Sequence, residues 1–507
     1  MYLFDFKSPL ALLDTAGMRA ADHMAIKAGV SGERLMEEAG RAVAEEALRA
    51  FRPDDALILA GPGNNGGDGW VAARHLAEAG VRVRVAATVG KEALGGDAAV
   101  MSGRYDGACV PFDSGAIPGA GLIIDALFGS GLARPLEPAV RAVSDAVARA
   151  GVPVLAVDIP SGVGGDDGSV SPGAIRADLT VTFFRKKPGH LLMPGRLMCG
   201  RIIVRDIGIP ESVLDSLRPH VFENDPALWA PLMSPHDPMG HKYHRGHALI
   251  AGGRPPCLGA ARLAARAALR AGAGLVTLAT PEEAYAIQAA AAPDEVMVRP
   301  FSSEEDFEAL LGTRRISALL LGPGGGADAA MRKQVLAALR HGMKAVLDAD
   351  ALNAFAGPTA QLLFDAIASD VALTPHEGEF VRLFGEDMLA SKLDRASAAA
   401  HRSGAVLLLK GPDSVIAAPT GEAVIEAGGP PHLATAGSGD VLAGILLAMM
   451  ARGMPALAAA AAAAGLHAMA ARLHGEGMIA SDITESLPRI FASLTDHQML
   501  SFGRKVL

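Results

Sequence analysis

The sequence is poor in cysteine, in aromatic residues and in net positive charge, and each shortage excludes a class of protein. Its three cysteines, Cys109, Cys199 and Cys257, match neither a metal-ligand spacing nor a disulfide framework, which predicts a reducing compartment. Aromatic residues make up 4% of the chain and glycine contributes 59 residues, which favours many tight loops over an all-β sandwich. The formal charge of -9 argues against a broad nucleic-acid surface.

The sequence also lacks a recognisable signal peptide and an uninterrupted membrane span. The start, MYLFDFKSPLALLDTAG, carries Asp5 and has no basic stretch followed by a clean apolar run. The longest apolar stretch, MPALAAAAAAAGLHAMAA, is mostly alanine and is interrupted by Pro455, Gly465 and His467, which predicts a buried helix. We therefore predict a cytoplasmic protein without a membrane or nucleic-acid partner.

The length and composition predict at least two domains with a large core, because half of the 507 residues are hydrophobic and a fifth are charged. In the first third, short apolar runs such as ALILAG, VRVRVAAT and VPVLAVDIPSG alternate with stretches of helical periodicity such as WVAARHLAEAG. This alternation predicts a parallel sheet covered by helices on both faces.

The alternation stops in a stretch rich in proline and histidine, IPESVLDSLRPHVFENDPALWAPLMSPHDPMGHKYHRG, which we interpret as a domain junction with its boundary near Phe222. Its histidines could indicate a metal site, but no acidic or cysteine partner recurs at ligand spacing, which favours a polar loop. Beyond it, HALIAGG, LVTLAT, ALLLGPGGG and AVLLLKGPDS predict the strands of a second α/β domain. We expect domains over residues 1–222 and 223–507.

Small polar residues follow three predicted strands of the first domain, where an open parallel sheet binds its ligands. GPGNNGGDGW follows DDALILA, Asp125 ends a second apolar run, and Asp158 and Ser161 follow a third. The glycines would let backbone N–H groups approach a ligand in a loop that opens the helix WVAARHLAEAG. The loop is neither a Walker motif nor a clean G-x-G-x-x-G, and each motif alone could be a helix cap. Together they could form one pocket, whose hard oxygen ligands suit an alkali or alkaline-earth ion.

GPGNNGGDG, DALFGSGL and DIPSGV, with the preceding MRAADHMAIKAGVSGERLMEEAG, closely resemble the NAD(P)HX epimerase family, which has a Rossmann-like three-layer fold. The resemblance covers nearly all of residues 10 to 220. It implies that Asn65, Asp125 and Ser161 hold potassium, and that Asp158 touches the damaged nicotinamide ring as the catalytic group. It also implies that the substrate contacts Asn64, Asn65, Gly66, Gly67, Asp68, Gly129, Ser130, Gly131, Leu132, Ala133, Arg134 and Pro135.

The second half carries a different motif, HLATAGSGDVLAG, in which small residues and Asp440 stand just before an apolar helix. The N–H groups of residues 436–439 and the helix dipole would favour an anion there. Asp440 would stay ionised at a helix start, so it could act as a base toward a hydroxyl held beside a phosphate. A plain helix cap is the alternative, although Gly437 and Gly439 would be poor choices for a cap.

This motif, together with GPGGG, VLDADALN, TPHEGEF and LLLKGPDSVIA, resembles the ADP-dependent NAD(P)HX dehydratase family, whose α/β fold is ribokinase-like. The matching pieces span about residues 240 to 500. The resemblance implies that NAD(P)HX contacts Ala260, Gly324, His376 and Asp440. It implies that the adenine nucleotide contacts Lys410, Gly411, Pro412, Asp413, Ser414 and Gly439.

Both resemblances imply the repair of hydrated NADH and NADPH, the small molecules NADHX and NADPHX. The first domain would interconvert the R and S forms. The hydroxyl is on a carbon next to nitrogen, so the ring can open or lose water and re-close on either face. Asp158 would move the proton. The second would dehydrate the S form with ADP, giving NAD(P)H, AMP and phosphate. Asp440 would take the proton of the ring hydroxyl as it attacks the terminal phosphoryl group, and magnesium would help to neutralise the developing charge.

Two other interpretations remain open at this point. The second domain could be a small-molecule kinase, such as a vitamin-precursor kinase, although TPHEGEF and KGPDS argue against it. The first domain could be an RNA- or protein-binding module, although Asn65, Asp125 and Asp158 are intact and the acidic balance disfavours RNA. We also expect a homo-oligomer.

Overall fold

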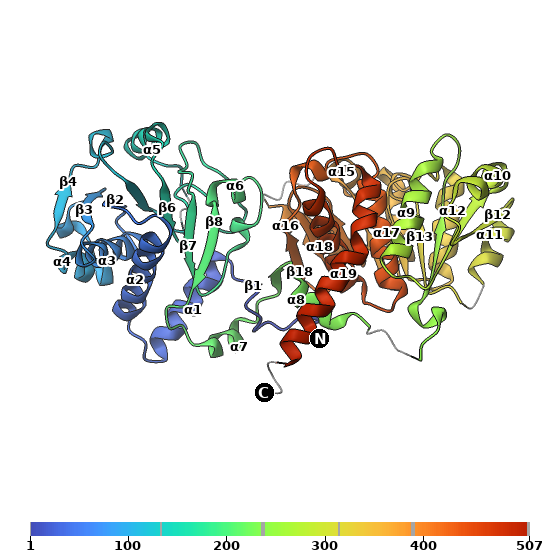
Figure 1. Ribbon diagram of the computed structural model, residues 1–507, viewed down its shortest axis with the longest axis horizontal. Helices are drawn as coiled ribbons and strands as arrows, with labels where there is room; N and C mark the ends of the chain where they lie inside the picture. Colours follow the sequence, from blue (N-terminus) through green and yellow to red (C-terminus); the bar gives the residue numbers. More distant parts are fainter. Residues whose placement is uncertain (1, 132–133, 235–238, 313–314, 387–390, 504–507) are drawn as a thin grey trace. The chain divides into compact units, whose positions relative to one another are not determined.

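The structure, a computed structural model, describes residues 2–131, 134–234, 239–312, 315–386 and 391–503. The chain forms two compact units: one comprises Asp5–Val221, and the other comprises Phe222–Leu507 together with Met1–Phe4. Each unit is an α/β structure (Figure 1).

The N-terminal unit has a parallel sheet with the strand order β4-β3-β2-β5-β6-β7-β8. Its strands are β2 (Asp55–Ala60), β3 (Arg82–Ala87), β4 (Ala108–Val110), β5 (Leu122–Ala126), β6 (Val154–Val157), β7 (Leu179–Phe183) and β8 (Arg201–Arg205), and a two-residue strand, β1 (Ala11–Leu12), precedes them. Its helices are α1 (Thr15–Lys27), α2 (Gly32–Ala50), α3 (Asn64–Glu78), α4 (Gly96–Gly103), α5 (Pro138–Ala150), α6 (Arg196–Cys199) and α7 (Leu214–Leu217).

Strand β2 shows why both faces of this sheet are covered. Ile58 packs in a core cluster that includes Val43 of α2, whereas Leu57 packs in a second cluster that includes Val140 of α5. Successive side chains of a strand point to opposite faces, so a continuous apolar strand needs a helix layer on each side. Figure 1 shows α2 and α3 on one side of the sheet and α5 on the other, which confirms the predicted three-layer, Rossmann-like fold.

The strand order places the candidate site. Strand β2 lies between β3 and β5, and the later strands extend the sheet away from β3. The loops after β2, β5 and β6 therefore meet where an open sheet changes its direction of winding, which is where such sheets bind ligands.

The C-terminal unit has a mixed sheet, in which β18-β17-β16-β15-β14-β13-β10-β11-β12 are neighbours. The strands from β10 to β16 are parallel, and β17 is antiparallel to both of its neighbours, β16 and β18. The strands are β9 (Val221–Glu223), which lies beside β18, β10 (His247–Ala251), β11 (Leu275–Pro281), β12 (Val296–Phe301), β13 (Ala318–Leu321), β14 (Ala345–Leu347), β15 (Val371–Leu373), β16 (Val406–Leu409), β17 (Ser414–Ala417) and β18 (Ala423–Glu426).

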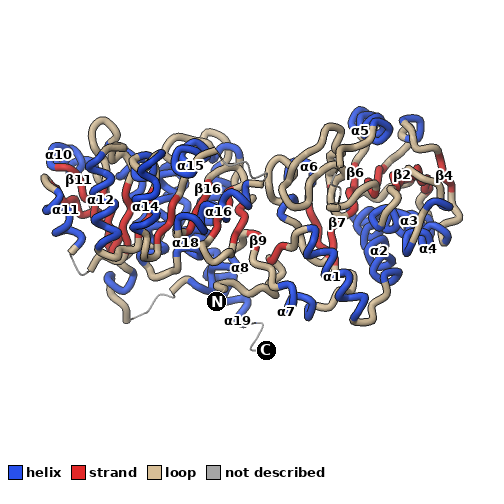
Figure 2. The backbone as a smooth tube through the Cα atoms, turned by 180° about the vertical axis from the view of Figure 1, so that it is seen from behind, coloured by secondary structure: helices blue, strands red, loops and turns tan. Residues whose placement is uncertain are grey.

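Helices cover both faces of this sheet as well, and Figure 2 shows α12, α14 and α16 in front of the strands. On the other face α17 packs against α9, α18 and β13. The helices are α8 (Pro226–Trp229), α9 (Leu258–Arg270), α10 (Glu282–Ala291), α11 (Glu304–Leu311), α12 (Ala329–Arg340), α13 (Asp350–Asn353), α14 (Ala360–Ala366), α15 (Glu377–Phe384), α16 (Lys392–Ser403), α17 (Ser438–Ala451), α18 (Ala456–His474) and α19 (Ala480–Gly503).

The alanine-rich segment forms α18, which is long and apolar enough to cross a membrane by length and composition alone. Most of its residues are buried within the unit, however, where it packs against α17, α19 and β17. The prediction of a buried helix is confirmed.

The first residues of the chain belong to the C-terminal unit. The backbone N–H groups of Leu3 and Phe4 donate to Oε1 of the buried Glu422 at 2.7 and 3.1 Å. The ring of Phe4 packs edge-on against Phe222, with centroids 5.5 Å apart. The core of the C-terminal unit therefore uses residues that directly precede and directly follow the N-terminal unit in the sequence.

Candidate active sites

The asparagine- and glycine-rich segment is the start of a helix. Helix α3 begins at Asn64, directly after Gly63, so NNGGDG forms its first turns. This corrects the expectation of a loop that only precedes the helix. The short connection from β2 to α3 places the first N–H groups of α3 at the carboxyl edge of the sheet, where they favour an anion.

Close packing explains the glycines of α3 better than backbone freedom does. A Cβ atom at Gly66 would lie 2.0 Å from the carbonyl oxygen of Gly61, and one at Gly69 would lie 2.6 Å from the Cβ atom of Ala126. Gly61 follows β2 and Ala126 ends β5, so glycine lets the helix start directly against both strand ends.

The second glycine loop follows β5 and approaches two predicted site residues. A Cβ atom at Gly129 would lie 3.0 Å from Oδ2 of Asp158 and 3.3 Å from Oδ1 of Asn65. The buried Nδ2 atom of Asn65 has no hydrogen-bond partner within the described part of the chain. Leu132 and Ala133 lie outside the described residues.

Asp125 and Ser161 are in direct contact at the ends of β5 and β6. The backbone N–H of Ser161 donates to Oδ2 of Asp125 at 2.7 Å, and its hydroxyl donates to Oδ1 at 2.6 Å. The Asp125 side chain is completely buried. Burial raises the pKa of Asp125 to about 6, although the hydrogen bonds from Ser161 and Leu127 favour its charged form.

Asp158 is held by an ion pair that the sequence analysis did not include. Lys187, which follows β7, donates from Nζ to Oδ1 of Asp158 and also to Oγ1 of Thr182 at 2.9 Å. The N–H of Ser130 donates to the other carboxylate oxygen at 3.1 Å. Burial alone would raise the pKa of Asp158, but the charge and hydrogen bond of Lys187 hold it below its usual value. Asp158 is therefore an anion at neutral pH.

His190 fixes the backbone of this segment. Its Nδ1 atom accepts from the N–H of Lys187 at 2.9 Å, so Nε2 carries the proton that is donated to the carbonyl of Asp158 at 2.9 Å. Burial and the charge of Lys187 together lower the pKa of His190 to about 4, which keeps the ring neutral. Asp158 has a positive φ of 66°, a left-handed conformation that this hydrogen bond stabilises.

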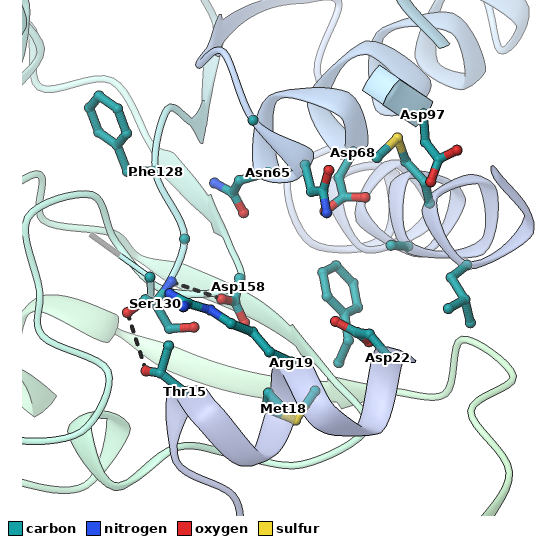
Figure 3. A pocket seen from close by; sticks show the side chains of 18 of the residues that line it. Thr15, Met18, Arg19, Asp22, Asn65, Asp68, Asp97, Phe128, Ser130 and Asp158 are labelled. Atoms are coloured by element: carbon teal, nitrogen blue, oxygen red, sulfur yellow. Dashed lines mark hydrogen bonds between the residues drawn. The ribbon is translucent and has the colours of Figure 1, made fainter. Parts of the chain in front are cut away.

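These groups surround one cavity of about 540 Å³ in the N-terminal unit (Figure 3). Of the predicted substrate contacts that the structure describes, Gly66, Gly67 and Pro135 do not line it. Asp125 and Ser161 do not line it either. The lining includes the predicted Asn64, Asn65, Asp68, Gly129, Ser130, Gly131, Arg134 and Asp158, and also Thr15, Arg19, Asp22 and Lys187, which sequence reasoning missed.

In the C-terminal unit, Asp440 lies in the first turn of α17 behind Gly437, which caps the helix with a φ of 83°. A glycine is needed at that cap because other residues rarely adopt this conformation. Burial and the neighbouring Asp348 raise the pKa of Asp440 to about 6, against the opposing charge of Lys410. A carboxylate with this pKa is still mostly ionised at neutral pH, as expected, and the shift makes Asp440 a stronger base.

Lys410 lies beside this helix start and is held by two carboxylates. Its Nζ atom is 2.8 Å from Oδ1 of Asp348 and 3.8 Å from Oε2 of Glu379, and a Cβ atom at Gly439 would lie 3.7 Å from it. Burial disfavours its charge, but Asp348 and Glu379 raise the pKa of Lys410. The structure thus brings the predicted Lys410, Gly439 and Asp440 together.

Two loops meet between β10 and β13, where the order of the strands in this sheet reverses its direction. The N–H of Arg254 donates to the carbonyl of Gly324 at 2.8 Å, and Gly324 has a φ of 61°. Ala260 lies in the first turn of α9, directly after the β10 loop. His376 caps α15 through Nδ1, which accepts from the N–H of Gly378 at 3.0 Å.

The KGPDS segment is the turn from β16 to β17. The hydroxyl of Ser414 donates to the carbonyl of Gly411 at 3.1 Å, and Lys392 donates from Nζ to Oδ1 of Asp413 at 2.9 Å. Pro412 completes the turn, whose backbone is thereby fixed next to Lys410.

No group of three or more His, Cys, Asp or Glu side chains that could hold a metal ion is found in the described ranges. Residues 235–238 of the histidine-rich junction lie outside those ranges, and the three cysteines are free.

Comparison with known proteins gives two family matches. The model for NAD(P)H-hydrate dehydratase matches residues 248–490, and the model for the YjeF-related protein N-terminus matches residues 32–189. The bifunctional NAD(P)H-hydrate repair enzyme Nnr of Salinibacter ruber is 37% identical across 95% of this chain and 96% of its own length. The Nnr of Moorella thermoacetica is 37% identical across 91% of this chain and 93% of its own length.

One similar solved structure is an ADP/ATP-dependent NAD(P)H-hydrate dehydratase from Bacillus subtilis, co-crystallised with ATP and Mg²⁺. It is 27% identical, and the match covers 52% of this chain and 95% of that protein with a TM-score of 0.46. The two full-length relatives match through both units of the fold. The chain therefore belongs to the family of bifunctional NAD(P)H-hydrate repair enzymes.

Proposed function

We propose that residues 1–222 carry the epimerase activity and residues 223–507 the dehydratase activity of this family. The chain repairs hydrated NADH and NADPH: it interconverts the R and S forms of NAD(P)HX and dehydrates the S form with ADP, giving NAD(P)H, AMP and phosphate. The observation that supports the first assignment most directly is the 540 Å³ cavity, where the start of α3, the second glycine loop and Asp158 meet.

In the epimerase site, the two glycine-rich segments are proposed to hold the nucleotide part of the substrate. The first N–H groups of α3 favour phosphate groups, because they lack partners within the helix and lie at the positive end of its dipole. Asp158 is proposed to face the nicotinamide ring, where its ionised carboxylate accepts the proton of incoming water.

Asn65, Asp125 and Ser161 are proposed to hold potassium, and their chemistry fits that ion. They offer one carboxylate, one amide and one hydroxyl, which suit a monovalent cation better than magnesium. Burial raises the pKa of Asp125 to about 6, so a nearby cation would stabilise this carboxylate. When bound, potassium would supply positive charge near the substrate phosphates.

In the dehydratase site, Asp440 is proposed to take the proton from the substrate hydroxyl. Lys410, Gly411, Pro412, Asp413, Ser414 and Gly439 are proposed to contact ADP, and Ala260, Gly324, His376 and Asp440 to contact NAD(P)HX. Lys410 and the N–H groups at the start of α17 lie where they can neutralise a phosphoryl group. Asp348 and Glu379 beside Lys410 fit a magnesium ion that arrives on the nucleotide, since magnesium binds through one or two carboxylates plus phosphates and keeps its waters.

Two variants of the full chain test this division. Asp158→Asn is expected to stop epimerisation but dehydrate S-NADHX, whereas Asp440→Asn is expected to epimerise without dehydrating. A mixture of the two variants should then convert R-NADHX completely, because the S form can pass through solution. If either single variant loses both activities while it remains folded, the division is wrong.

We also propose that the protein acts in the cytoplasm as a homo-oligomer, with small-molecule substrates and without a nucleic-acid or membrane partner. The three free cysteines support a reducing compartment. Sedimentation equilibrium tests the assembly: a species of 51.9 kDa at all concentrations would be a monomer and would refute it.

A further inference from the structure

Four carboxylates line the epimerase cavity: one is Asp97 of α4, and the other three come from three further elements. Asp22 comes from α1, Asp68 from α3, and Asp158 from the loop after β6 (Figure 3). Asp158 is fixed by Lys187, Thr182 and the N–H of Ser130. No hydrogen bond or ion pair to the carboxylate of Asp22 or Asp68 is found among the residues that the structure describes.

Burial, and not the surrounding charge, favours the protonated form of Asp22. Lys187 and Asp158 act on Asp22 across the cavity, and His23 acts from its own helix. Lys187 already pairs with Asp158, so it neutralises only one of the four acids. Burial raises the pKa of Asp22 to about 6, Lys187 lowers it in part, and Asp158 raises it. Burial and the charges of Asp158 and Asp22 also raise the pKa of Asp68 well above its usual value.

Loss of the hydroxyl from one face of the ring and return of water to the other involve two proton transfers, which two separate groups can carry out. One group protonates the departing hydroxyl, and the other accepts a proton from the returning water. Asp158 can be the acceptor, but Lys187 keeps it ionised, so it has no proton to give. A second group in the same cavity must therefore supply the acid, and paired carboxylates with opposite shifts are the usual solution.

We propose that Asp22 is the second catalytic residue of the epimerase site and protonates the departing hydroxyl; this rests on the proposed function. The C–O bond next to the ring nitrogen breaks, the oxygen takes the proton of Asp22 and leaves as water, and the lone pair of the nitrogen completes a C=N bond. Water then adds to the other face of the ring and gives its proton to Asp158. The proton returns to Asp22 through solvent, so one water leaves and one enters.

Asp22 suits this role better than Asp68. Asp22 interacts with both members of the Asp158–Lys187 pair, whereas Asp68 interacts with Asp158 and Asp22. Asp68 also belongs to the helix start that is proposed to hold the nucleotide part of the substrate.

The test compares full-length Asp22→Asn, Asp68→Asn and wild-type protein on purified R-NADHX with excess ADP. Asp145→Asn is the matched control, because Asp145 is an exposed carboxylate on α5 away from the cavity. We expect kcat for loss of the R form to fall by about 10²- to 10⁴-fold in Asp22→Asn, with KM changed by less than about threefold. Dehydration of S-NADHX should be unchanged, which shows that the C-terminal unit is intact, and an unchanged KM for the R form shows that the epimerase site is folded.

The pH profile provides a second readout that a structural role would not move. A general acid must be protonated, so the wild-type epimerisation rate should fall as pH rises through about 6, the pKa of Asp22. Compared with Asp22→Asn, Asp22→Glu should restore part of the epimerisation rate and the fall of that rate with rising pH. If Asp22→Asn does not fold, a wild-type profile that is flat from about pH 5 to pH 8 would overturn the proposal.

The outcomes distinguish a failure of the proposed function from a failure of the proposal for Asp22. A wild-type chain that does not interconvert the epimers overturns the proposed function and this inference together. A wild-type chain that interconverts them while Asp22→Asn keeps the full rate overturns the inference alone. Loss of activity in Asp68→Asn with full activity in Asp22→Asn would assign the acid role to Asp68 and would also refute the proposal for Asp22.

Discussion

The ammonium group of Lys187 donates to the carboxylate of Asp158, and both side chains are withdrawn from solvent, with 2% and 16% of their surfaces exposed. The two residues follow neighbouring strands, β7 and β6, of the N-terminal sheet. This pair decides the protonation state of Asp158, because burial and the lysine charge act on its pKa in opposite directions.

Replacing Lys187 with methionine should therefore raise the pKa of Asp158, because burial would then act unopposed. We expect epimerisation at neutral pH to fall and the acidic limb of its pH profile to move to higher pH. Because the pKa of Asp158 is lower in the folded protein, its carboxylate stabilises the fold at pH values above about 4, the pKa of an Asp in the unfolded chain. This stabilisation is lost progressively as the pH falls below that value. The variant should lose about 3–5 kcal/mol at neutral pH, measured by urea unfolding. The exposed Lys27→Met serves as the control, and equal stability of the two variants would contradict the prediction.

Asp440→Asn should reduce dehydration by about 10²- to 10⁴-fold, because the general base is lost. In the wild type, a base must be ionised, so the dehydration rate should rise as pH increases through about 6, the pKa of Asp440. Stopped-flow absorbance of NADH formed from S-NADHX measures both. The exposed Asp365→Asn on α14 should behave like the wild type. A pH-independent wild-type rate would remove Asp440 from the role of base.

Asp125→Asn should weaken substrate binding in the epimerase site and remove its dependence on potassium. Asn keeps one acceptor oxygen for the N–H of Ser161, and its NH2 group can donate to the Ser161 hydroxyl, but it lacks the charge that would attract the ion. The measurement is the epimerisation rate against potassium concentration in stripped protein, with a large organic cation to keep the ionic strength constant. The dehydratase activity should not change. If the stripped wild-type protein shows no response to potassium, the proposed ion site is wrong.

Gly66→Ala should destabilise the N-terminal unit although alanine is the better helix former. The new methyl group would lie 2.0 Å from the carbonyl oxygen of Gly61, so α3 must move away from the strand ends. We expect a loss of more than about 1 kcal/mol, as for other overpacked sites. Gly103→Ala at the end of α4, with no atom within 4 Å, should be neutral or slightly stabilising. Equal melting temperatures of the two variants would contradict the packing explanation.

The rule that an open parallel sheet binds ligands at the carboxyl ends of its strands was enough to select Asp125, Asp158 and Ser161 from the sequence. Alternating apolar runs locate the strands, and parallel strands share one carboxyl edge. The same rule applies to Lys187, which follows β7, but a lysine within FRKKPGH carries no local sign of a buried partner. Asp22 lies within a helix, and only the tertiary placement of α1 brings it to the cavity.

Two further features depend on contacts that a local pattern cannot contain. The start of α3 at Asn64 is set by the ends of β2 and β5, since its glycines meet Gly61 and Ala126. The raised pKa of Asp440 depends on burial and on Asp348, which follows β14 and is distant in the sequence.

The central claim is that one chain returns both epimers of NADHX to NADH through two separate sites. The most direct measurement is NADH absorbance during incubation of the full chain with mixed R- and S-NADHX, with and without ADP. The account predicts no NADH without ADP, complete recovery from both epimers with ADP, and one AMP and one phosphate for each NADH formed. Recovery that stops when the S form is consumed and leaves R-NADHX unchanged, or recovery that needs no nucleotide, would contradict it.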